Sequence, residues 1–408
     1  MRERPNQKDT PDITVCHVST MTNWGGVERL LEDSLIHSHP TGIRNLLLAT
    51  SWSPDVVSMI QAANIPTLLL QRNGRFDLRA IHHAVSWLRN ERVDVLHSYN
   101  AFANIWGSLL ATLARIPIFI TGEHGTIWRT SGALFQLDRL AQRTAMANIV
   151  NSQAAAMLLH HRYGAPFDKI HVVTNAVAPL PAADVVNLRR SLGLGDAPVV
   201  GSIGRLDSPK DYHTLIDAAA LVLRKNENLR FMLVGGGPLE AELRARVTHL
   251  GIGGHFLMTG FRPDARQLVQ AFDLFVGTSI RESFGNVFVE AALAGVPAIA
   301  PMIDGIPEVV IDGQTGVLLA PRLPVRLPET PATPIGSLAV INGRLAAPQS
   351  LDPAELAGAI LNLMADPEQR ASLGAEAYRQ AKLRFSLERY TMDLVGLYRH
   401  LAAKPSSN

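Results

Sequence analysis

The sequence predicts an α/β fold made of two doubly wound domains, each built on a parallel sheet. Short apolar runs alternate with amphipathic helical segments over residues 13–151, and a second series of the same kind begins at residue 199. Short, wholly apolar strands separated by helices are typical of parallel pairing, in which helices cover both faces of the sheet. The length of 408 residues is enough for two or three domains, each with its own core.

The first half opens with an apolar run at residues 13–18, which predicts a strand. The pair Gly25 and Gly26 then predicts a turn, and apolar residues at helical spacing predict a helix over 27–38. Further short apolar runs predict strands at 45–49, 66–70, 93–97, 116–120 and 147–151. This series assigns residues 1–178 to the first domain.

The pattern pauses around Pro179 and Pro181, and we place a hinge at residues 176–186. The second domain is predicted to span residues 186–386. Its strands are expected at 199–204, 231–235, 256–260, 274–278 and 298–300. Because ligands bind at the carboxyl ends of the strands in such sheets, two halves of this kind predict a ligand cleft between them.

Residues 321–350 interrupt the second half with six prolines. A stretch of this length is longer than loops in compact domains usually are, so we interpret it as an inserted loop. After it, Asp352 and Pro353 predict the start of a helix. The last segment, residues 387–408, is predicted to form a helix that returns to the first domain.

Composition and charge exclude several classes of protein. The formal net charge is only +2, so no nucleic-acid binding is expected. The single cysteine, Cys16, lies in an apolar run, which predicts a small buried side chain and suits a reducing cytoplasm. The first ten residues are too polar for a signal peptide, and no apolar stretch is long enough to span a membrane. All five tryptophans precede residue 180, which indicates either core positions or a first-domain surface for lipid or glycan.

Glu282 and Glu290 flank a Ser-Phe-Gly turn that precedes an apolar helical run. If the helix begins near Gly285, Glu282 lies at its N-terminus and Glu290 lies more than one turn inside. Backbone N–H groups at a helix N-terminus bind phosphate, while a carboxylate beside them can meet sugar hydroxyls. The motif therefore predicts a site for a nucleotide sugar.

Arg205 and Lys210 follow the first predicted strand of the second half. A guanidinium and an ammonium in one loop suit a diphosphate, and no carboxylate pattern here looks arranged to neutralise both cations. The chain has no Asp-x-Asp pair for a divalent metal, no Walker loop, no zinc-binding helix and no nucleophile elbow. We therefore expect a metal-free site in which cations and helix N-termini neutralise the diphosphate.

Two histidines lie at equivalent places in the first half. His97 ends the predicted strand at 93–97, and His124 comes just after the strand at 116–120. A histidine at this edge can exchange a hydrogen bond with a sugar hydroxyl, so the pair favours such a role for one of them.

Two glycine clusters are open to more than one interpretation. Gly25 and Gly26 would let the backbone approach a phosphate, although two glycines are equally typical of an ordinary turn. The run of glycines at 235–237 fails the dinucleotide-binding fingerprint because Glu240 stands where that motif has its last glycine. It predicts a tight turn from strand to helix instead.

Taken in this order, the motifs resemble the retaining, nucleotide-sugar-dependent glycosyltransferases of family 4 (glycosyl transferases group 1). The resemblance covers residues 13–390 apart from 321–350, and it implies the GT-B fold of two Rossmann-like domains. It is carried by four segments: 282–297 with its two glutamates, 204–210 with Arg205 and Lys210, 234–239 with its run of glycines, and 305–316 with its Gly-Ile-Pro-Glu motif.

The resemblance implies roles for the second-domain residues. Arg205 and Lys210 bind the donor diphosphate, Glu282 holds hydroxyls of the donor sugar, and Glu290 holds the ribose. The backbone of Phe284, Gly285 and Asn286 also faces the donor.

In the first, acceptor-side domain, the resemblance places Gly25 and Gly26 near the β-phosphate and His124 against the transferred sugar. It implies a catalytic group of His124, Glu282, Arg205 and Lys210, and transfer with retention of anomeric configuration by front-face attack. No cofactor is required. The expected donor is a UDP-sugar, with a GDP-sugar second.

The expected acceptor is a glycan, a lipid-linked glycan or another hydroxyl compound in cell-surface polysaccharide or glycolipid synthesis. The expected location is the cytoplasm, with peripheral contact at the inner membrane through the first domain left open. Two other functions remain: a nucleotide-sugar epimerase of the same architecture, and a non-catalytic nucleotide-sugar-binding protein. The chain departs from the family pattern at Ala176 and Ser283, where the family commonly has glycine, and after His97, which lacks a second histidine two places on.

Overall fold

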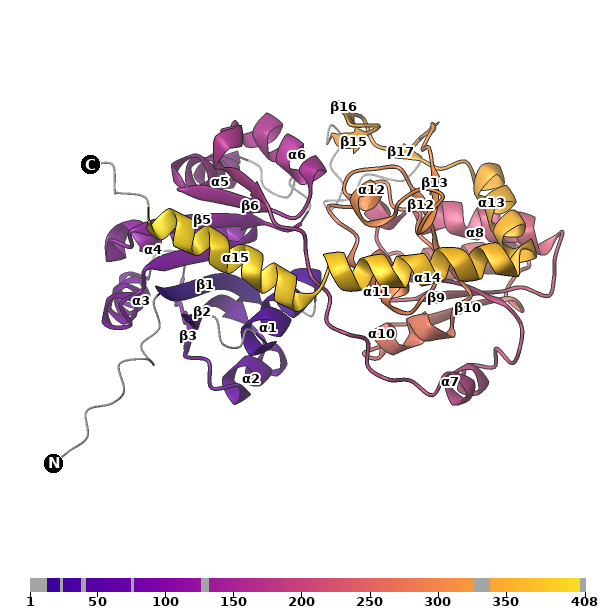
Figure 1. The fold of residues 1–408 in the computed structure, drawn as a ribbon, viewed down its shortest axis with the longest axis horizontal. Helices are drawn as coiled ribbons and strands as arrows, with labels where there is room; N and C mark the ends of the chain where they lie inside the picture. The colour runs from indigo at the N-terminus through magenta and orange to yellow at the C-terminus, as the bar shows by residue number, and fades with distance from the viewer. Residues whose placement is uncertain are drawn as a thin grey trace. The chain divides into compact units, whose positions relative to one another are not determined.

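A computed structural model describes residues 13–22, 25–37, 42–74, 77–125, 132–325 and 338–403, which form two compact units (Figure 1). The first unit comprises Met1–Ala176 and Leu387–Asn408, and the second comprises Val177–Ser386. Each unit is built on one large parallel sheet with helices between the strands. The predicted α/β class with doubly wound parallel sheets is therefore confirmed.

The sheet of the first unit has seven parallel strands in the order β3-β2-β1-β4-β5-β6-β7. The strands are β1 (Ile13–Met21), β2 (Ile43–Trp52), β3 (Thr67–Leu69), β4 (Val95–Tyr99), β5 (Ile118–Glu123), β6 (Ala147–Val150) and β7 (Ile170–Val172). The helices of this unit are α1 (Gly26–His37), α2 (Pro54–Ala62), α3 (Leu78–Asn90), α4 (Asn100–Ala114), α5 (Gly132–Thr144), α6 (Gln153–Tyr163) and α15 (Leu387–Ala402).

Helix α15 completes the first unit although it comes from the end of the chain. Figure 1 shows it lying along the sheet beside β1 and β5. Its residues Tyr390, Leu394 and Tyr398 are buried in one apolar cluster with Val15 and Ile120 of those strands. Burial of such side chains contributes about 1.5–3 kcal/mol each, which is enough to hold a helix far removed in sequence.

The sheet of the second unit has six parallel strands in the order β10-β9-β8-β11-β12-β13. The strands are β8 (Val199–Ile203), β9 (Arg230–Val234), β10 (Phe256–Gly260), β11 (Leu274–Val276), β12 (Ala298–Pro301) and β13 (Gly316–Leu319). The helices are α7 (Val185–Ser191), α8 (Tyr212–Leu223), α9 (Glu240–His249), α10 (Ala265–Leu268), α11 (Asn286–Leu293), α12 (Ile306–Val309), α13 (Pro353–Ala365) and α14 (Pro367–Arg384).

Residues 321–350 are expected to form one inserted loop, and this expectation is wrong for residues 338–350. Residues 338–350 contain an antiparallel hairpin of β15 (Ala339–Ile341) and β16 (Arg344–Ala346), and β14 (Leu323–Pro324) pairs with β17 (Gln349–Ser350). The hairpin turn consists of Asn342 and Gly343, both with positive φ, which suits a two-residue turn. Prolines dominate the composition of this stretch, but they lie outside the hairpin. The remaining residues of the insertion, 326–337, lie outside the described parts of the chain.

The structure also bears on the predictions made for Cys16 and for membrane-spanning segments. Cys16 is fully buried in β1, as its apolar neighbours predict. None of the helices in the described parts is long and apolar enough to cross a membrane.

Candidate functional site

The loops after β8 and β11 carry the strongest predicted residues of the second unit. These strands are neighbours in the sheet, and the strand order changes direction between them. In doubly wound sheets, such a switch point leaves a crevice at the carboxyl ends of the strands. Arg205 and Lys210 follow β8 and Glu282 follows β11, so the sheet brings residues distant in sequence to one edge.

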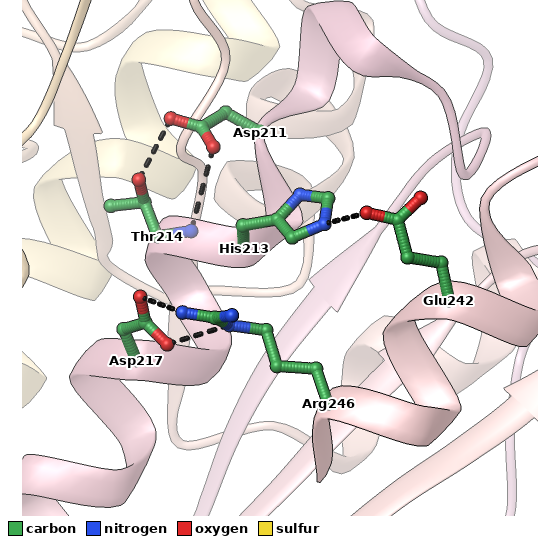
Figure 2. A network of polar contacts seen from close by, with 6 residues as sticks. All are labelled: Asp211, His213, Thr214, Asp217, Glu242 and Arg246. Atoms are coloured by element: carbon green, nitrogen blue, oxygen red, sulfur yellow. Dashed lines mark hydrogen bonds and ion pairs between the residues drawn. The ribbon is translucent and has the colours of Figure 1, made fainter. Parts of the chain in front are cut away.

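Helix α8 fixes the chain at Lys210. Lys210 ends a short 3-10 turn, Ser208–Lys210, and Asp211 follows it with a φ of 45°. The carboxylate of Asp211 caps α8 by accepting hydrogen bonds from the hydroxyl (2.7 Å) and the backbone N–H (3.5 Å) of Thr214 (Figure 2). Because Asp211 serves the helix, it is not placed as the ion-pair partner of the lysine before it.

Two polar contacts brace α8 against α9, as Figure 2 shows. Arg246 donates two hydrogen bonds to the carboxylate of Asp217, at 2.7 and 2.5 Å. His213 lies 2.8 Å from the carboxylate of Glu242. Exposed contacts of this kind contribute little stability individually. The orientation of α8 depends mainly on its apolar face, which is buried in the core of the second unit, and the polar contacts add to it.

Both cations of the loop have carboxylate partners in the folded chain. Arg205 donates through Nε to Asp207 at 2.6 Å, and the ammonium of Lys210 contacts the carboxylate of Glu282. The expectation that no carboxylate is arranged to neutralise both cations is therefore wrong. Asp207 pairs with Arg205 within the loop, and Glu282 reaches Lys210 from the loop after a neighbouring strand, which the local sequence does not reveal.

The two ion pairs differ in their exposure to solvent. The Arg205 side chain is 55% exposed, whereas those of Lys210 and Glu282 are 21% and 16% exposed. Arg205 can therefore turn toward a ligand at low cost. The Lys210–Glu282 pair is held in place, yet an ammonium has three donors and a carboxylate about four acceptor positions, so both retain capacity for a ligand.

Helix α11 begins where the sequence predicts. Gly285 is its N-cap residue, with a φ of 97°, and a Cβ there would lie 2.7 Å from Cδ2 of Phe288. Only glycine suits this position, because it combines a left-handed backbone with a close neighbour. No side chain in the described parts caps the helix. Its N-terminus, with partial positive charge, therefore lies three residues after Glu282 and suits an anionic ligand.

The other predicted residues of this segment divide between core and site. The Phe284 side chain is buried, with its ring 5.5 Å from that of Phe385, so only its backbone is available to a ligand. Asn286 is the first residue of α11 and is half-buried. Glu290 lies within the helix, 3.5 Å from the guanidinium of Arg266. No sequence motif points to Arg266, which lies in the short helix α10 after β10.

The glycine run after β9 forms the predicted tight turn. A Cβ at Gly235 would lie 1.9 Å from the carbonyl oxygen of Gly204, and one at Gly237 would lie 2.5 Å from that of Leu206. The turn therefore packs directly on the backbone that carries Arg205. Any side chain at either position would displace that loop.

His124 lies just beyond β5 in the first unit and is buried, with 6% of its surface exposed. Its ring stacks on Tyr99, with centroids 5.4 Å apart, and the side-chain oxygen of Asn175 accepts from Nδ1 at 3.1 Å. Within the described residues Nε2 has no hydrogen-bond partner. Burial lowers the pKa of His124 to about 4, so at neutral pH the ring is an uncharged hydrogen-bonding group.

His97 belongs to the core of the first unit. It is fully buried, and its Nδ1 lies 2.7 Å from the hydroxyl of Tyr398 on α15 and 3.2 Å from that of Tyr99. Burial also holds its pKa well below the ordinary value. Of the two histidines considered, this one has the contacts of a structural residue.

Gly25 and Gly26 lie at the start of α1. Gly26 is the first residue of the helix, and the carbonyl oxygen of Gly25 accepts from the N–H of Arg29 at 3.1 Å. A Cβ at Gly25 would meet the carboxylate of Glu28 at 2.5 Å, so the glycine keeps this turn free of side chain. Residues 23 and 24 lie outside the described parts.

No group of three or more histidine, cysteine, aspartate or glutamate side chains in the described residues is arranged to hold a metal ion. Arg205, Lys210 and Arg266 each lie beside a carboxylate, as given above.

Comparison with known proteins assigns both halves of the chain to related families. Residues 24–179 match "Glycosyltransferase Family 4", and residues 185–329 match "Glycosyl transferases group 1". The chain is 30% identical over 305 residues to 2-deoxystreptamine glucosyltransferase from Streptomyces kanamyceticus, which covers 68% of this chain and 79% of that protein. It is 28% identical over 338 residues to D-inositol 3-phosphate glycosyltransferase from Corynebacterium efficiens, with 75% and 70% covered.

Solved structures show the same fold. HepE from Anabaena, crystallised in complex with UDP and glucose, superposes with a TM-score of 0.79 and is 23% identical. The superposition covers 95% of this chain and all of that chain (100%).

Proposed function

The chain belongs to the glycosyl transferases group 1 and is a glycosyltransferase, and from this membership we propose that it transfers a sugar from a UDP-sugar to a hydroxyl acceptor. One observation carries the proposal. Lys210 and Glu282 meet at the switch point of the second sheet, beside the N-terminus of α11. Cation, carboxylate and helix N-terminus are the three groups that a diphosphate joined to a sugar requires.

In this proposal the cations bind the diphosphate. Lys210 acts as a point charge, and Arg205 leaves Asp207 to donate in parallel to two phosphate oxygens. The backbone at Phe284, Gly285 and Asn286 adds the positive end of α11. These groups stabilise the charge that develops on the departing diphosphate, which is the main catalytic contribution expected of such a site.

The two glutamates bind hydroxyl groups. Glu282 accepts from hydroxyls of the donor sugar through the oxygen capacity that its contact with Lys210 leaves. Glu290 accepts from the ribose, with Arg266 holding its carboxylate. UDP is the preferred nucleotide because HepE, the structural relative described above, was crystallised with UDP; GDP-sugars enter the test for comparison.

The first unit contributes His124, Gly25 and Gly26. The uncharged His124 accepts a hydrogen bond from a hydroxyl of the transferred sugar through Nε2, while Asn175 accepts from its other nitrogen. The two glycines let the N-terminus of α1 approach the β-phosphate. The reaction proceeds with retention, by front-face attack of the acceptor oxygen, and without a metal ion.

Transfer assays test this function. The wild-type protein is incubated with UDP- and GDP-sugars, with and without a hydroxyl acceptor, and release of the nucleotide is followed. We expect UDP release that depends on one UDP-sugar, that persists in EDTA, and that yields a product of unchanged anomeric configuration. Absence of both binding and turnover with every donor would overturn the proposal. A donor altered without any acceptor would reveal an epimerase, and binding without turnover would reveal a binding protein.

Glu282→Gln makes the assay specific to the site. Removing a charged acceptor from a hydroxyl group that must be positioned for reaction lowers kcat/KM by roughly 10²-fold. Glu376→Gln is the matched control, because Glu376 lies on the surface of α14 and pairs only with neighbours on that helix in the described structure. A Glu282→Gln protein that works as well as Glu376→Gln would exclude the assigned role.

The acceptor is proposed to be a glycan or a lipid-linked glycan, reached at the cytoplasmic face of the membrane. Six large apolar side chains are exposed on the contacting helices α4 and α5: Phe102, Leu109, Leu113, Leu134, Leu137 and Leu140. Exposed apolar residues gathered in this way favour contact with a lipid surface. Sedimentation with vesicles containing phosphatidylglycerol should be reduced by Leu137→Glu, while Leu383→Glu on the second unit should sediment as the wild type does. Equal sedimentation of the two variants would remove the membrane from the proposal.

A further inference from the structure

Asp304 lies between the loop that carries Glu282 and the hairpin of the insertion. It follows β12 and has a φ of 45°, and its side chain is 1% exposed. One carboxylate oxygen accepts from Nε of Arg281 at 2.8 Å and from the backbone N–H of Glu282 at 3.0 Å. The other accepts from the backbone N–H of Val340, in β15, at 2.8 Å. Burial raises the pKa of this carboxyl group, and the three donors act against that rise.

Backbone contacts join the same three segments. The N–H of Asp304 donates to the carbonyl of Val340 at 2.7 Å, and the N–H of Gly305 donates to the carbonyl of Glu282 at 3.1 Å. A Cβ at Gly305 would lie 2.1 Å from the carbonyl oxygen of Ser283, so the two loops are in direct contact. Glu282 is therefore held through both its N–H and its carbonyl by residues 304 and 305.

The hairpin is anchored in the core of the second unit. Ala339 and Ile341 are buried in the same apolar cluster as Ile303, Ile306 and Phe284. Ile303 and Ile341 also form an isolated antiparallel bridge. Since Phe284 follows Glu282 by two residues, the hairpin and the glutamate loop rest on one packed cluster, which transmits displacement rather than absorbing it.

We propose that Asp304 and the β15–β16 hairpin act as a clasp that positions Glu282, so that recognition of the donor sugar depends on the inserted hairpin. Asp304 is a positioning residue here, because it touches the backbone of Glu282 and no reacting atom. The inference rests on the proposed function in one respect: Glu282 is taken to bind the sugar. Arg205 and Lys210, the cations assigned to the diphosphate, follow β8, and neither contacts Asp304 among the described residues. Lys210 meets this arrangement only through the carboxylate of Glu282.

If the clasp positions Glu282, loosening it should affect the affinity for the UDP-sugar much more than the affinity for UDP. Loosening it should weaken binding of the UDP-sugar at least 10-fold and change the ranking of UDP-sugars, while binding of UDP alone changes less than threefold. A variant that merely destabilised the unit would affect both ligands alike. Calorimetric titration of the full chain with UDP and with a panel of UDP-sugars measures the difference.

The first variant is Asp304→Asn, which keeps the shape and suits positive φ but removes the charge. Its control is Asp273→Asn. Asp273 also accepts from an arginine, Arg189, and from a backbone N–H, that of Val199, but it lies at the amino ends of β8 and β11 in the same sheet. Loss of UDP-sugar binding in Asp304→Asn and not in Asp273→Asn is expected; equal behaviour of the two variants would overturn the clasp.

Asp304→Asn leaves the buried Arg281 without its counter-charge and could fail to fold, so a second variant acts from outside. Gly343 lies in the exposed hairpin turn with a φ of 71° and no atom within 4 Å of an added Cβ. Gly343→Val strains the turn while leaving Asp304 intact. Gly251→Val is its control, because Gly251 is equally exposed and has a φ of 69° with the same free space.

Gly343→Val should weaken binding of the UDP-sugar and spare UDP, whereas Gly251→Val should change neither. If Gly343→Val behaves as Gly251→Val does, the hairpin does not control Glu282 and the inference is wrong. Failure of the proposed function would look different: the wild type itself would bind no UDP-sugar, or Glu282→Gln would bind it as well as the wild type.

Discussion

Replacing Lys210 with alanine removes the ammonium that contacts Glu282 and leaves the rest of the site in place. The pair is partly buried, with side chains 21% and 16% exposed, so its loss should lower the free energy of unfolding by only about 1–2 kcal/mol. The effect on catalysis should be larger. A preorganised donor that stabilises developing charge contributes about 3–4 kcal/mol, so kcat/KM should fall by roughly 10²–10³-fold.

The assay compares UDP release by the wild type, Lys210→Ala and Lys225→Ala under subsaturating donor, with urea denaturation of each. Lys225 is exposed just beyond α8, so its variant controls for loss of one positive charge from the same unit. We expect a large loss of kcat/KM only in Lys210→Ala, with a small shift of the urea midpoint. A loss below threefold would refute the assignment of Lys210 to the diphosphate, and unfolding of the variant would show that the pair is mainly structural.

Three further predictions concern stability. Gly285→Ala should lower the free energy of unfolding by about 2–3 kcal/mol, because the φ of Gly285 is 97° and the new Cβ would meet Phe288. Gly313→Ala, with a φ of 69° and free space around the new Cβ, should lower it by only about 1 kcal/mol. Equal losses of stability in urea would contradict this prediction. Asp211→Ala should cost about 1 kcal/mol through loss of the α8 cap, measured as a lower urea midpoint, and should raise the KM for donor through displacement of Lys210; an unchanged midpoint would contradict it. His17 of β1 is buried like His124, and burial lowers the pKa of both to about 4, so the unfolded chain binds protons more readily than the folded one below about pH 6.5. The free energy of unfolding should therefore fall between pH 7 and 4.5, by roughly 2 kcal/mol for each histidine, and a flat profile in urea titrations would disprove it.

Local sequence patterns predict the fold class and the start of helix α11, which forms one part of the candidate site. The apolar runs gave the positions of most strands because buried parallel strands are wholly apolar, and Gly285 gave the start of α11 because a left-handed N-cap there requires glycine. The strands β7 and β13 were missed. Each is short and only partly buried, with 3 and 4 residues, so neither makes a distinct apolar run.

Contacts through space could not be predicted from the same patterns. The partner of Lys210 is 72 residues away, and the donor to the second oxygen of Asp304 is 36 residues away. Nothing in the sequence near either residue identifies its partner, because both contacts arise from the order of strands in the sheet. The contact of Arg266 with Glu290 has the same origin, whereas the β15–β16 hairpin is a local element. The proline content of 321–350 indicated a loop, whereas two residues suited to a hairpin turn, Asn342 and Gly343, carried the relevant signal.

The pairing of charges in the folded chain bears on how the proposed donor would enter. Two cations left unpaired in a partly buried site would be costly to desolvate, and each is instead held by a carboxylate, Arg205 by Asp207 and Lys210 by Glu282. A diphosphate that binds both cations replaces these carboxylates with groups of the same sign. The charge balance around the cations then changes little, while Glu282 is released to accept hydroxyls from the sugar. Because that release requires the glutamate backbone to stay where it is, the contacts of residues 304 and 305 with it become as important as the ion pair itself.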